Sequence, residues 1–339
     1  METKFYFFMK HTYFLSVLGL LLTLTSCEQQ QTKKEQSYTI QGSVDGQTKG
    51  KIYLLEFKNR EYTAVDSVDI NNGNFKFEGN TSEPLVYSLR LNNVGKRANF
   101  FLENTNITLH LNQNWEIETI KGDKNTQLFK QYDDLNEKRA LNLDSILKTD
   151  NNSPVIAYFL GRNAYMYDYP QLVSLRKQIA PELLKNTYIE ELDTAINKLE
   201  KLQPGNPAPD VIMENPEGKT FKLSDLKGKN VLIDFWATWC PDCLKEIPSL
   251  KEIYKTYNSK NFTILSISLD RNKKNWQKAI ADGLSWEHGF VENAWKSEAA
   301  QTYTLRWLPT YILIDANGTI IARTIESHKM IEEIEKLVK

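Results

Sequence analysis

Cys240 and Cys243 are the residues whose types and spacing most plainly allow chemistry. They lie three positions apart in the segment FWATWCPDCLKEIP, residues 235–248, behind an apolar run and ahead of a helical pattern. Pro241 suits the first position of a helix, where a missing N–H costs nothing. The free N–H groups and the dipole at that end of a helix favour a thiolate at Cys240, whose pKa can fall from about 8.5 by one to several units. We therefore expect Cys240 to attack a disulfide and Cys243 to resolve the mixed disulfide that forms.

A metal site and a structural disulfide are the other possibilities for this pair. Structural zinc usually needs four Cys or His ligands in two close pairs, and the sequence has no second pair. The histidines His110, His288 and His328 are far apart in the sequence. A structural bridge between residues three apart would close a very short loop and would restrict the unfolded chain little. The sequence therefore predicts a redox pair, with no metal site and no cofactor.

Resolution of a mixed disulfide needs a proton acceptor near Cys243, and two carboxylates are candidates. Asp234 interrupts the apolar run VLIDFW, where burial should raise its pKa towards neutrality. Glu246 follows Cys243 by three residues, which places it on the same face of a helix. Glu246 could equally be a solvated helix residue, whereas a lone carboxylate in an apolar strand requires a specific reason.

Composition and charge narrow the class of protein. The chain has 339 residues, enough for two domains, with 41% hydrophobic and 25% charged residues. Its net charge of -1 gives no basis for nucleic acid as a partner. Only three cysteines occur, so the fold must depend on packing rather than on a disulfide framework.

The N-terminus has the features of a targeting segment. Lys4 and Lys10 provide a basic start, and the apolar stretch at residues 13–24 is too short to span a bilayer comfortably. It ends in Leu-Thr-Ser-Cys, which looks like a bacterial lipobox with Cys27 as the lipidated residue; a cleaved secretory peptide is the alternative. We therefore predict a lipoprotein signal peptide at residues 1–26 and a flexible polar tether at 27–37.

Three further segments follow the tether. Residues 38–120 contain short runs of alternating apolar and polar residues separated by turn signals, which predicts an antiparallel β domain. That segment has one histidine, no cysteine and no recognisable cluster of catalytic groups, so it is interpreted as a spacer or docking module. Residues 121–202 carry apolar residues at helical spacing and are predicted to form a helical connecting region. After the Pro- and Gly-rich stretch at 203–210, strands and helices alternate to the end, which predicts an α/β domain at 203–339.

The segment FWATWCPDC resembles the active site of thioredoxins, and the following EIP resembles the membrane-anchored TlpA/ResA branch of that family. The similarity covers about residue 205 to the end and implies a thioredoxin fold. Asp234 matches the buried aspartate of thioredoxins, and Glu246 matches the active-site glutamate of ResA-like proteins. Pro248 matches the proline that kinks the active-site helix. The preceding β domain is similar to an uncharacterised module found before thioredoxin domains in bacterial lipoproteins.

The resemblance also implies where a substrate binds. The tripeptide Leu-Pro-Thr at 308–310 stands where the family has its cis-proline loop, so Pro309 should be cis and lie beside the cysteines. The backbone of Leu308 should pair with an extended segment of the substrate. The substrate-binding residues implied in this way are Trp239, Leu308, Pro309 and Thr310.

Together these features predict a membrane-tethered thiol–disulfide oxidoreductase of the bacterial cell envelope, anchored by lipid and facing the periplasm or cell exterior. The resemblance implies that it reduces disulfides of partner proteins, as ResA-like proteins often do with apocytochrome c. Its partners would be protein disulfides or dithiols, together with a membrane electron donor. The alternatives are a copper-binding chaperone, which would need His288 or His328 near the cysteines, and a thiol peroxidase. A peroxidase usually has threonine three positions before the reactive cysteine, where this chain has Ala237.

Two positions depart from the family pattern. Asp242 places a carboxylate between the cysteines, and its charge is expected to oppose the Cys240 thiolate and favour a more reducing couple. Trp307 is a bulky residue two positions before Pro309. It would either narrow the substrate groove or simply pack.

Overall fold

The computed structural model describes residues 37–92, 95–281 and 283–338. The predicted signal peptide (1–26), Cys27 and the predicted tether up to residue 36 lie outside the described residues. Within the described part of the chain, no helix is long and apolar enough to cross a membrane.

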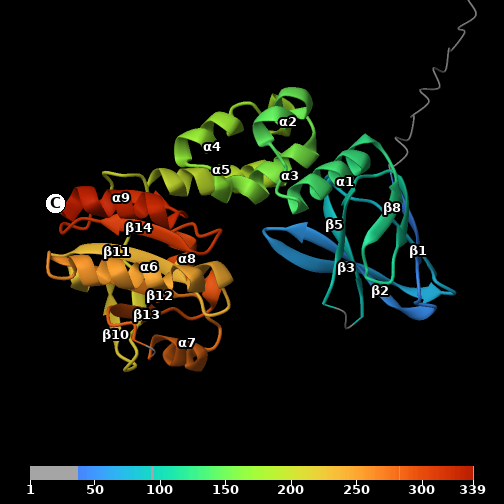
Figure 1. Ribbon diagram of the computed structural model, residues 1–339. Helices are drawn as coiled ribbons and strands as arrows, with labels where there is room; N and C mark the ends of the chain where they lie inside the picture. Colours follow the sequence, from blue (N-terminus) through green and yellow to red (C-terminus); the bar gives the residue numbers. More distant parts are fainter. Residues whose placement is uncertain (1–36, 93–94, 282, 339) are drawn as a thin grey trace, which may run out of the picture. The chain divides into compact units, whose positions relative to one another are not determined.

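The N-terminal strands form an eight-stranded sheet in the order β6-β5-β2-β3-β4-β1-β7-β8 (Figure 1). Its pairs are antiparallel except for β1 and β7, which run parallel. The predicted antiparallel β domain is thus confirmed, with one parallel pair that local periodicity could not indicate. The strands are β1 (Tyr38–Val44), β2 (Lys49–Lys58), β3 (Glu61–Asn71), β4 (Asn74–Gly79), β5 (Leu85–Leu91), β6 (Ala98–Leu102), β7 (Asn106–Leu111) and β8 (Ile117–Lys121).

Helices follow, and polar side chains cap them. Asp123, Asn142, Ser153, Asp168 and Asn186 each precede a helix and accept a hydrogen bond from a backbone N–H of its first turn, which fixes where the helix begins. The buried faces of these helices pack together with the core of the N-terminal sheet in one apolar cluster. The helices are α1 (Lys124–Glu137), α2 (Leu143–Asp150), α3 (Pro154–Asn163), α4 (Tyr169–Arg176) and α5 (Thr187–Glu200).

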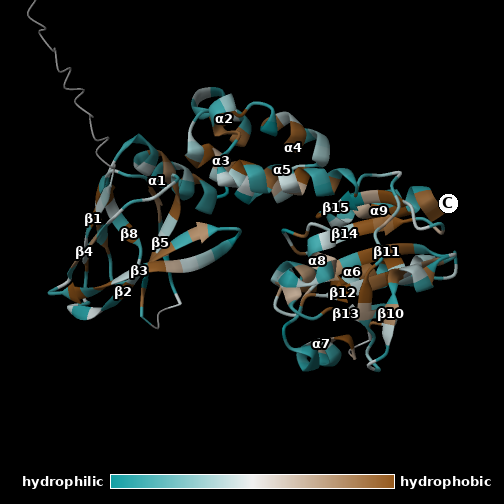
Figure 2. Ribbon diagram, turned by 180° about the vertical axis from the view of Figure 1, so that it is seen from behind, coloured by the Kyte–Doolittle hydropathy of each residue, from teal (hydrophilic) through white to brown (hydrophobic). Residues whose placement is uncertain are grey.

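The C-terminal part is a seven-stranded sheet in the order β10-β9-β13-β12-β11-β14-β15. β11, β12 and β13 run parallel, and β14 and β15 add antiparallel strands at one side. The strands β11 and β12 are buried almost throughout because both faces of the sheet are covered, and most of their residues are hydrophobic (Figure 2). The strands are β9 (Ile212–Glu214), β10 (Thr220–Lys222), β11 (Asn230–Trp236), β12 (Phe262–Ser268), β13 (Glu287–Phe290), β14 (Thr310–Ile314) and β15 (Ile320–Thr324).

Four helices accompany this sheet: α6 (Pro241–Tyr257), α7 (Lys273–Ile280), α8 (Glu298–Thr302) and α9 (Ser327–Val338). Because side chains alternate along a strand, Leu232 in β11 faces α6 and α9. Ile233 and the odd-numbered residues of β11 face the side that holds Trp276 of α7. The predicted α/β order is confirmed, although the sequence did not indicate β13, which has only four residues.

Candidate functional site: a cysteine pair at the start of α6

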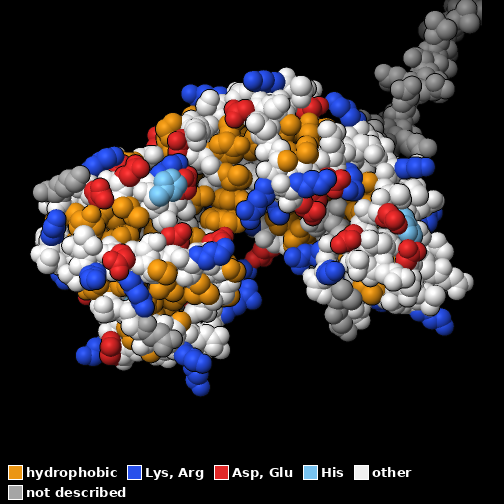
Figure 3. All heavy atoms as spheres, in the orientation of Figure 1, with side chains coloured by type: hydrophobic (Ala, Val, Ile, Leu, Met, Phe, Trp, Pro, Cys, Tyr) orange, Lys and Arg blue, Asp and Glu red, His pale blue; other side chains and the backbone are white. Residues whose placement is uncertain are grey.

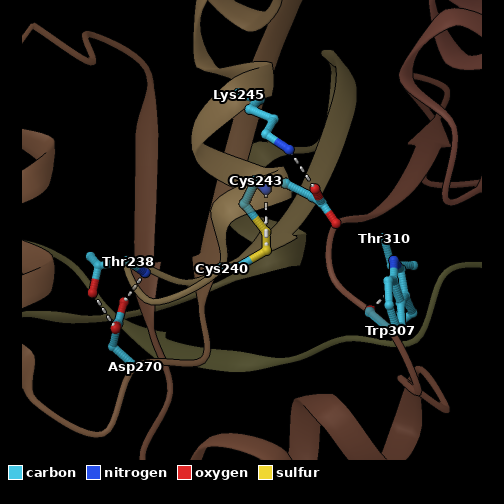
Figure 4. Close-up of a disulfide and its surroundings, with 8 residues drawn as sticks. Thr238, Cys240, Cys243, Lys245, Asp270, Trp307 and Thr310 are labelled. Atoms are coloured by element: carbon cyan, nitrogen blue, oxygen red, sulfur yellow. Dashed lines mark hydrogen bonds and ion pairs between the residues drawn. A yellow bond between two sulfur atoms is a disulfide. The ribbon is translucent and has the colours of Figure 1, made fainter. Parts of the chain in front are cut away.

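Cys240 is the N-cap of α6, and Pro241 occupies the first helical turn. The Cys240 sulfur accepts a hydrogen bond from the backbone N–H of Cys243 at 3.1 Å, and the two sulfurs are joined by a disulfide (Figure 4). In the reduced protein this N–H would point at the Cys240 thiolate, where it and the helix dipole stabilise negative charge. The placement predicted from the sequence, between a strand and a helix, is therefore confirmed.

A buried carboxylate holds the loop that leads to Cys240. Asp270 is 2% exposed and follows β12 by two residues. It accepts hydrogen bonds from the Thr238 N–H at 3.0 Å and from the Thr238 hydroxyl at 2.6 Å, both drawn in Figure 4. The Ser268 hydroxyl donates a third bond at 2.7 Å. These bonds fix the backbone two residues before the N-terminal cysteine of the pair.

Asp234 lies in the middle of β11 and is 3% exposed. Its even position directs the side chain to the face covered by α6 and α9. The Ser266 hydroxyl of the neighbouring strand donates to Asp234 at 2.9 Å, and Trp286 Nε1 donates to the same hydroxyl at 2.8 Å. The pKa of Asp234 is raised to about 7: burial raises it most, the hydrogen bond from Ser266 lowers it, and the charge of Glu246 adds to the rise. The carboxyl group can therefore exchange a proton near neutral pH.

Glu246 and Tyr311 share the electrostatic surroundings of Asp234. Glu246 is half-buried on α6, three residues after Cys243. The Tyr311 hydroxyl is buried and, among the described residues, has no hydrogen-bond partner. Burial raises the pKa of Tyr311, and the charges of Asp234 and Glu246 add to the effect. The sheet and α6 thus bring together the two carboxylates that the sequence analysis proposed as proton acceptors.

The Leu308–Pro309 peptide bond is cis, as predicted. Leu308 is buried in the same apolar cluster as Cys240 and Cys243. The Thr310 hydroxyl donates to the Trp307 carbonyl at 2.8 Å, which closes the loop on itself. In the view of Figure 4, this loop lies on the side of the disulfide away from Asp270.

The two tryptophans near the site differ in exposure and contacts. Trp307 stacks on Tyr165 with ring centroids 4.6 Å apart and planes 3° from parallel, so it packs against another aromatic ring. Trp239 is 51% exposed and lies beside Trp295 at 6.3 Å between ring centroids. Trp239 therefore offers an apolar surface next to the disulfide.

Asp242, the carboxylate between the cysteines, is exposed and forms an ion pair with Lys245 at 3.1 Å (Figure 4). An exposed pair of this kind is screened by solvent, and the lysine offsets the charge of Asp242. The expected opposition between Asp242 and the Cys240 thiolate is thereby weakened.

Neither histidine needed for a copper site lies with the cysteines. His288 is buried, its Nε2 lies 3.1 Å from the Leu284 carbonyl, and burial lowers its pKa to about 4. His328 pairs with Glu326 at 3.3 Å. Among the described residues, the cysteines belong to no group of three or more potential metal ligands. Thr238 lies one position after Ala237, the position where a thiol peroxidase usually has threonine. Its hydroxyl donates a hydrogen bond to Asp270.

The sequence analysis missed several residues that support the site, namely Thr238, Asp270, Ser266, Trp286 and Tyr311. Only Asp270 had a local signal, because it lies two residues after the end of a buried parallel strand, where functional side chains often gather. The others are ordinary strand or loop residues that reach Asp234 or Asp270 through sheet pairing.

Two family models match separate parts of the chain. Residues 203–338 match the Redoxin family, and residues 38–152 match a domain of unknown function, DUF4369. The chain is 34% identical over 146 residues to the thiol-disulfide oxidoreductase ResA of Bacillus cereus (strain ATCC 10987 / NRS 248), a match that covers 42% of this chain and 81% of that protein. It is 32% identical over 125 residues to the ResA of Bacillus subtilis (strain 168), covering 36% of this chain and 67% of that protein.

A solved structure also matches part of this chain. The thioredoxin domain of a thiol-disulfide oxidoreductase from Bacteroides vulgatus is 33% identical, with a TM-score of 0.38, and the match covers 40% of this chain and 99% of that one. The Redoxin match contains the Cys240–Cys243 pair and the cis-proline loop, and the ResA of Bacillus cereus is matched over 81% of its length at 34% identity. The chain therefore belongs to the TlpA/ResA-like thiol–disulfide oxidoreductases of the thioredoxin family.

Proposed function

We propose that this protein reduces disulfides of partner proteins in the bacterial cell envelope. The observation that carries the proposal is the position of Cys240 at the start of α6, where its sulfur accepts a hydrogen bond from the backbone N–H of Cys243. A thiolate stabilised there is the attacking group of thiol–disulfide exchange. The half-exposed Trp239 and the cis-proline loop at Leu308–Thr310 would hold an extended segment of the partner beside it.

The proposed reaction has two exchange steps. The Cys240 thiolate attacks one sulfur of the partner disulfide, the other partner sulfur leaves as a thiolate, and a mixed disulfide forms. Asp234 or Glu246 then accepts the Cys243 proton, the new thiolate attacks the Cys240 sulfur, and the second partner sulfur leaves. The partner gains two electrons and two protons, and the Cys240–Cys243 disulfide must be reduced again by a two-electron donor at the membrane.

The direction of this exchange is testable through the reduction potential of the pair. We expect a reduction potential of about -270 mV, which corresponds to a reductant, when the full chain is equilibrated with dithiothreitol redox buffers. The oxidised fraction would be followed by alkylation and mass spectrometry. A Cys240→Ser variant, which cannot form the disulfide, is the control for unrelated thiols. A value near about -120 mV would identify an oxidant that introduces disulfides and would reverse the proposed direction.

We further propose that Cys27 carries the lipid that holds the protein at the membrane, facing the periplasm or cell exterior. The sequence Leu-Thr-Ser-Cys at the end of the apolar stretch supports this. Several acyl chains on one cysteine give stable anchoring where a single chain gives reversible binding.

If Cys27 anchors the protein, replacing it should move the protein from the membrane fraction to the soluble fraction. In a bacterial host, the wild-type protein should sediment with membranes and Cys27→Ser should not, since the acceptor for lipid is removed. The measurement is immunoblotting after ultracentrifugation, with the mass of the N-terminal peptide as a second readout. Cys240→Ser is the matched cysteine control and should stay with the membranes. A Cys27→Ser protein that still sediments would rule out this anchor.

A further inference from the structure

We infer that the N-terminal β domain contains a binding site for a divalent transition-metal cation, formed by Asp45, His110 and Glu118. Among the described residues, this is the one group of three or more His, Cys, Asp or Glu whose ligand atoms all lie within 4.8 Å of one another. Figure 3 shows histidine and acidic side chains side by side on the surface of this domain. The site uses neither cysteine of the redox pair, so it is independent of the proposed reductase activity.

Sheet pairing brings these residues together from the turn after β1 and from the strands β7 and β8. Ser43 in β1 lies opposite His110 in the parallel strand β7. Asp45 directly follows the end of β1, and its N–H donates to the Leu111 carbonyl at 2.9 Å, which holds it beside β7. The side chains of Asp45, His110 and Glu118 therefore meet at the end of β1.

Glu118 reaches the same cluster through an irregularity in β8. His110 pairs with Thr119 and Leu111 pairs with Ile117, so Glu118 is an extra residue without a partner in the ladder. A bulge of this kind redirects the side chain of the extra residue and is frequent beside functional sites. Here it directs a second carboxylate to the imidazole of His110.

The distances fit a shared cation better than direct ion pairs. His110 Nε2 lies 3.3 Å from Asp45 Oδ2 and 3.5 Å from Glu118 Oε2. A charge-assisted hydrogen bond would be about 2.7 to 2.9 Å long. A tetrahedral zinc ion with bonds of about 2.0 to 2.2 Å separates its ligand atoms by roughly 3.3 to 3.6 Å. Both observed distances fall in that second range.

Charge and hydrogen bonding at these three residues also favour a bound cation. A single proton on His110 Nε2 cannot satisfy two carboxylates, whereas a divalent cation neutralises both. Ser43 Oγ lies 2.8 Å from Nδ1, so an Nδ1–H donated to this hydroxyl leaves the Nε2 lone pair free for a metal. Side chains of Asp45 and Glu118 are more than half exposed, which leaves the remaining coordination positions to water. The imidazole favours zinc and similar ions over Ca²⁺ and Mg²⁺, which take oxygen ligands.

The test is a zinc titration of the full chain against a chromophoric chelator, with the Cys240–Cys243 pair oxidised and Cys27 replaced by serine so that no thiol competes. One Zn²⁺ per chain is expected, and excess Ca²⁺ or Mg²⁺ should not displace it. His110→Gln and Glu118→Gln should weaken binding at least tenfold, and Ser43→Ala about 10- to 100-fold through loss of the histidine's partner. Co²⁺ should give the strong visible absorption of a tetrahedral site, lost in His110→Gln.

Glu116→Gln is the matched control, because Glu116 is an exposed carboxylate just before the same strand and pairs with Asn112. His328→Gln controls for the exposed His328–Glu326 pair. Both variants should bind zinc as the parent chain does. The inference is overturned if the oxidised parent binds no zinc, or if His110→Gln, folded by circular dichroism, binds as tightly as Glu116→Gln.

Discussion

Replacing Cys240 with serine is expected to lower disulfide reduction by at least about a thousandfold, because a hydroxyl at this position cannot replace the thiolate as nucleophile. Replacing Cys243 with serine should have a different result. Cys240 would still attack, since the N–H of residue 243 that faces its sulfur belongs to the backbone. The mixed disulfide would then accumulate, because the resolving thiol is missing.

The two variants can be separated with 5,5′-dithiobis(2-nitrobenzoate) on the reduced full chain carrying Cys27→Ser. The parent should release two thionitrobenzoate ions per chain and close its disulfide. Cys243→Ser should release one ion and retain one as a stable adduct on Cys240, which mass spectrometry would locate. Cys240→Ser should react slowly, because Cys243 is 3% exposed and does not occupy the N-cap.

Insulin reduction at limiting dithiothreitol gives the corresponding turnover measurement. Both variants should be inactive, and circular dichroism would establish that each is folded. If Cys240→Ser formed the adduct and Cys243→Ser did not, the roles assigned to the two cysteines would be reversed.

Replacing Asp234 with asparagine is expected to slow resolution of the mixed disulfide by about 10²- to 10⁴-fold, the usual contribution of a positioned general base. In the parent chain the resolution rate should rise as pH increases through about 7, the value to which burial raises the pKa of Asp234. The Asp234→Asn variant should lose that rise. Stopped-flow mixing of the reduced chain with one equivalent of 5,5′-dithiobis(2-nitrobenzoate), between pH 5 and 9, provides the profile through the release of the second thionitrobenzoate ion.

The same substitution should change stability in a pH-dependent manner. Between about pH 4 and pH 7 the folded state holds a proton on Asp234 that the unfolded chain releases, so the free energy of unfolding falls as pH rises. A shift from an ordinary value near 4 to about 7 corresponds to about 4 kcal/mol. Asparagine carries no charge, so Asp234→Asn should be more stable than the parent at pH 8, with the difference vanishing towards pH 4.

Asp270→Asn is a matched control with the opposite expected sign. Asp270 is equally buried but accepts three hydrogen bonds, from the Thr238 N–H, the Thr238 hydroxyl and the Ser268 hydroxyl. The NH₂ group of an asparagine there would face the N–H and O–H groups that now donate to Asp270. The lost hydrogen bonds should destabilise the protein by about 1 to 3 kcal/mol at pH 8. Urea unfolding of the oxidised proteins at pH 5 and pH 8 measures both variants. A loss of stability in Asp234→Asn at pH 8 would contradict the proposed protonation of Asp234.

Local sequence determined much of the C-terminal domain. The strand that ends at Trp236, the helix that begins at Pro241 and the cysteine at its N-cap all follow from short-range rules, namely an apolar run, a proline suited to the first turn and exposed N–H groups. The unusual position of Asp234 was visible for the same reason, because one carboxylate in a fully apolar strand stands out. The cis state of Pro309 followed from the resemblance rather than from any local rule.

Only the tertiary structure decided which residues support the cysteines. Thr238 and Asp270 are 32 residues apart in sequence and meet because β11 and β12 pair in parallel. Tyr311 reaches Asp234 through the antiparallel pairing of β14 with β11. These contacts depend on strand order and register, which are set by packing between distant segments and leave no periodic signal in any one of them.

In the β domain, too, strand order and register could not be predicted from the sequence. Its alternating runs indicated strands, yet nothing in them indicated that β1 would pair in parallel with β7. That pairing and the bulge at Glu118 bring Asp45, His110 and Glu118 together, in a segment where the sequence suggested only a spacer or docking module. The sequence by itself thus determined the redox pair and the strand–helix order around it. The long-range register of two sheets decided the hydrogen-bond support of that pair and the cluster around His110.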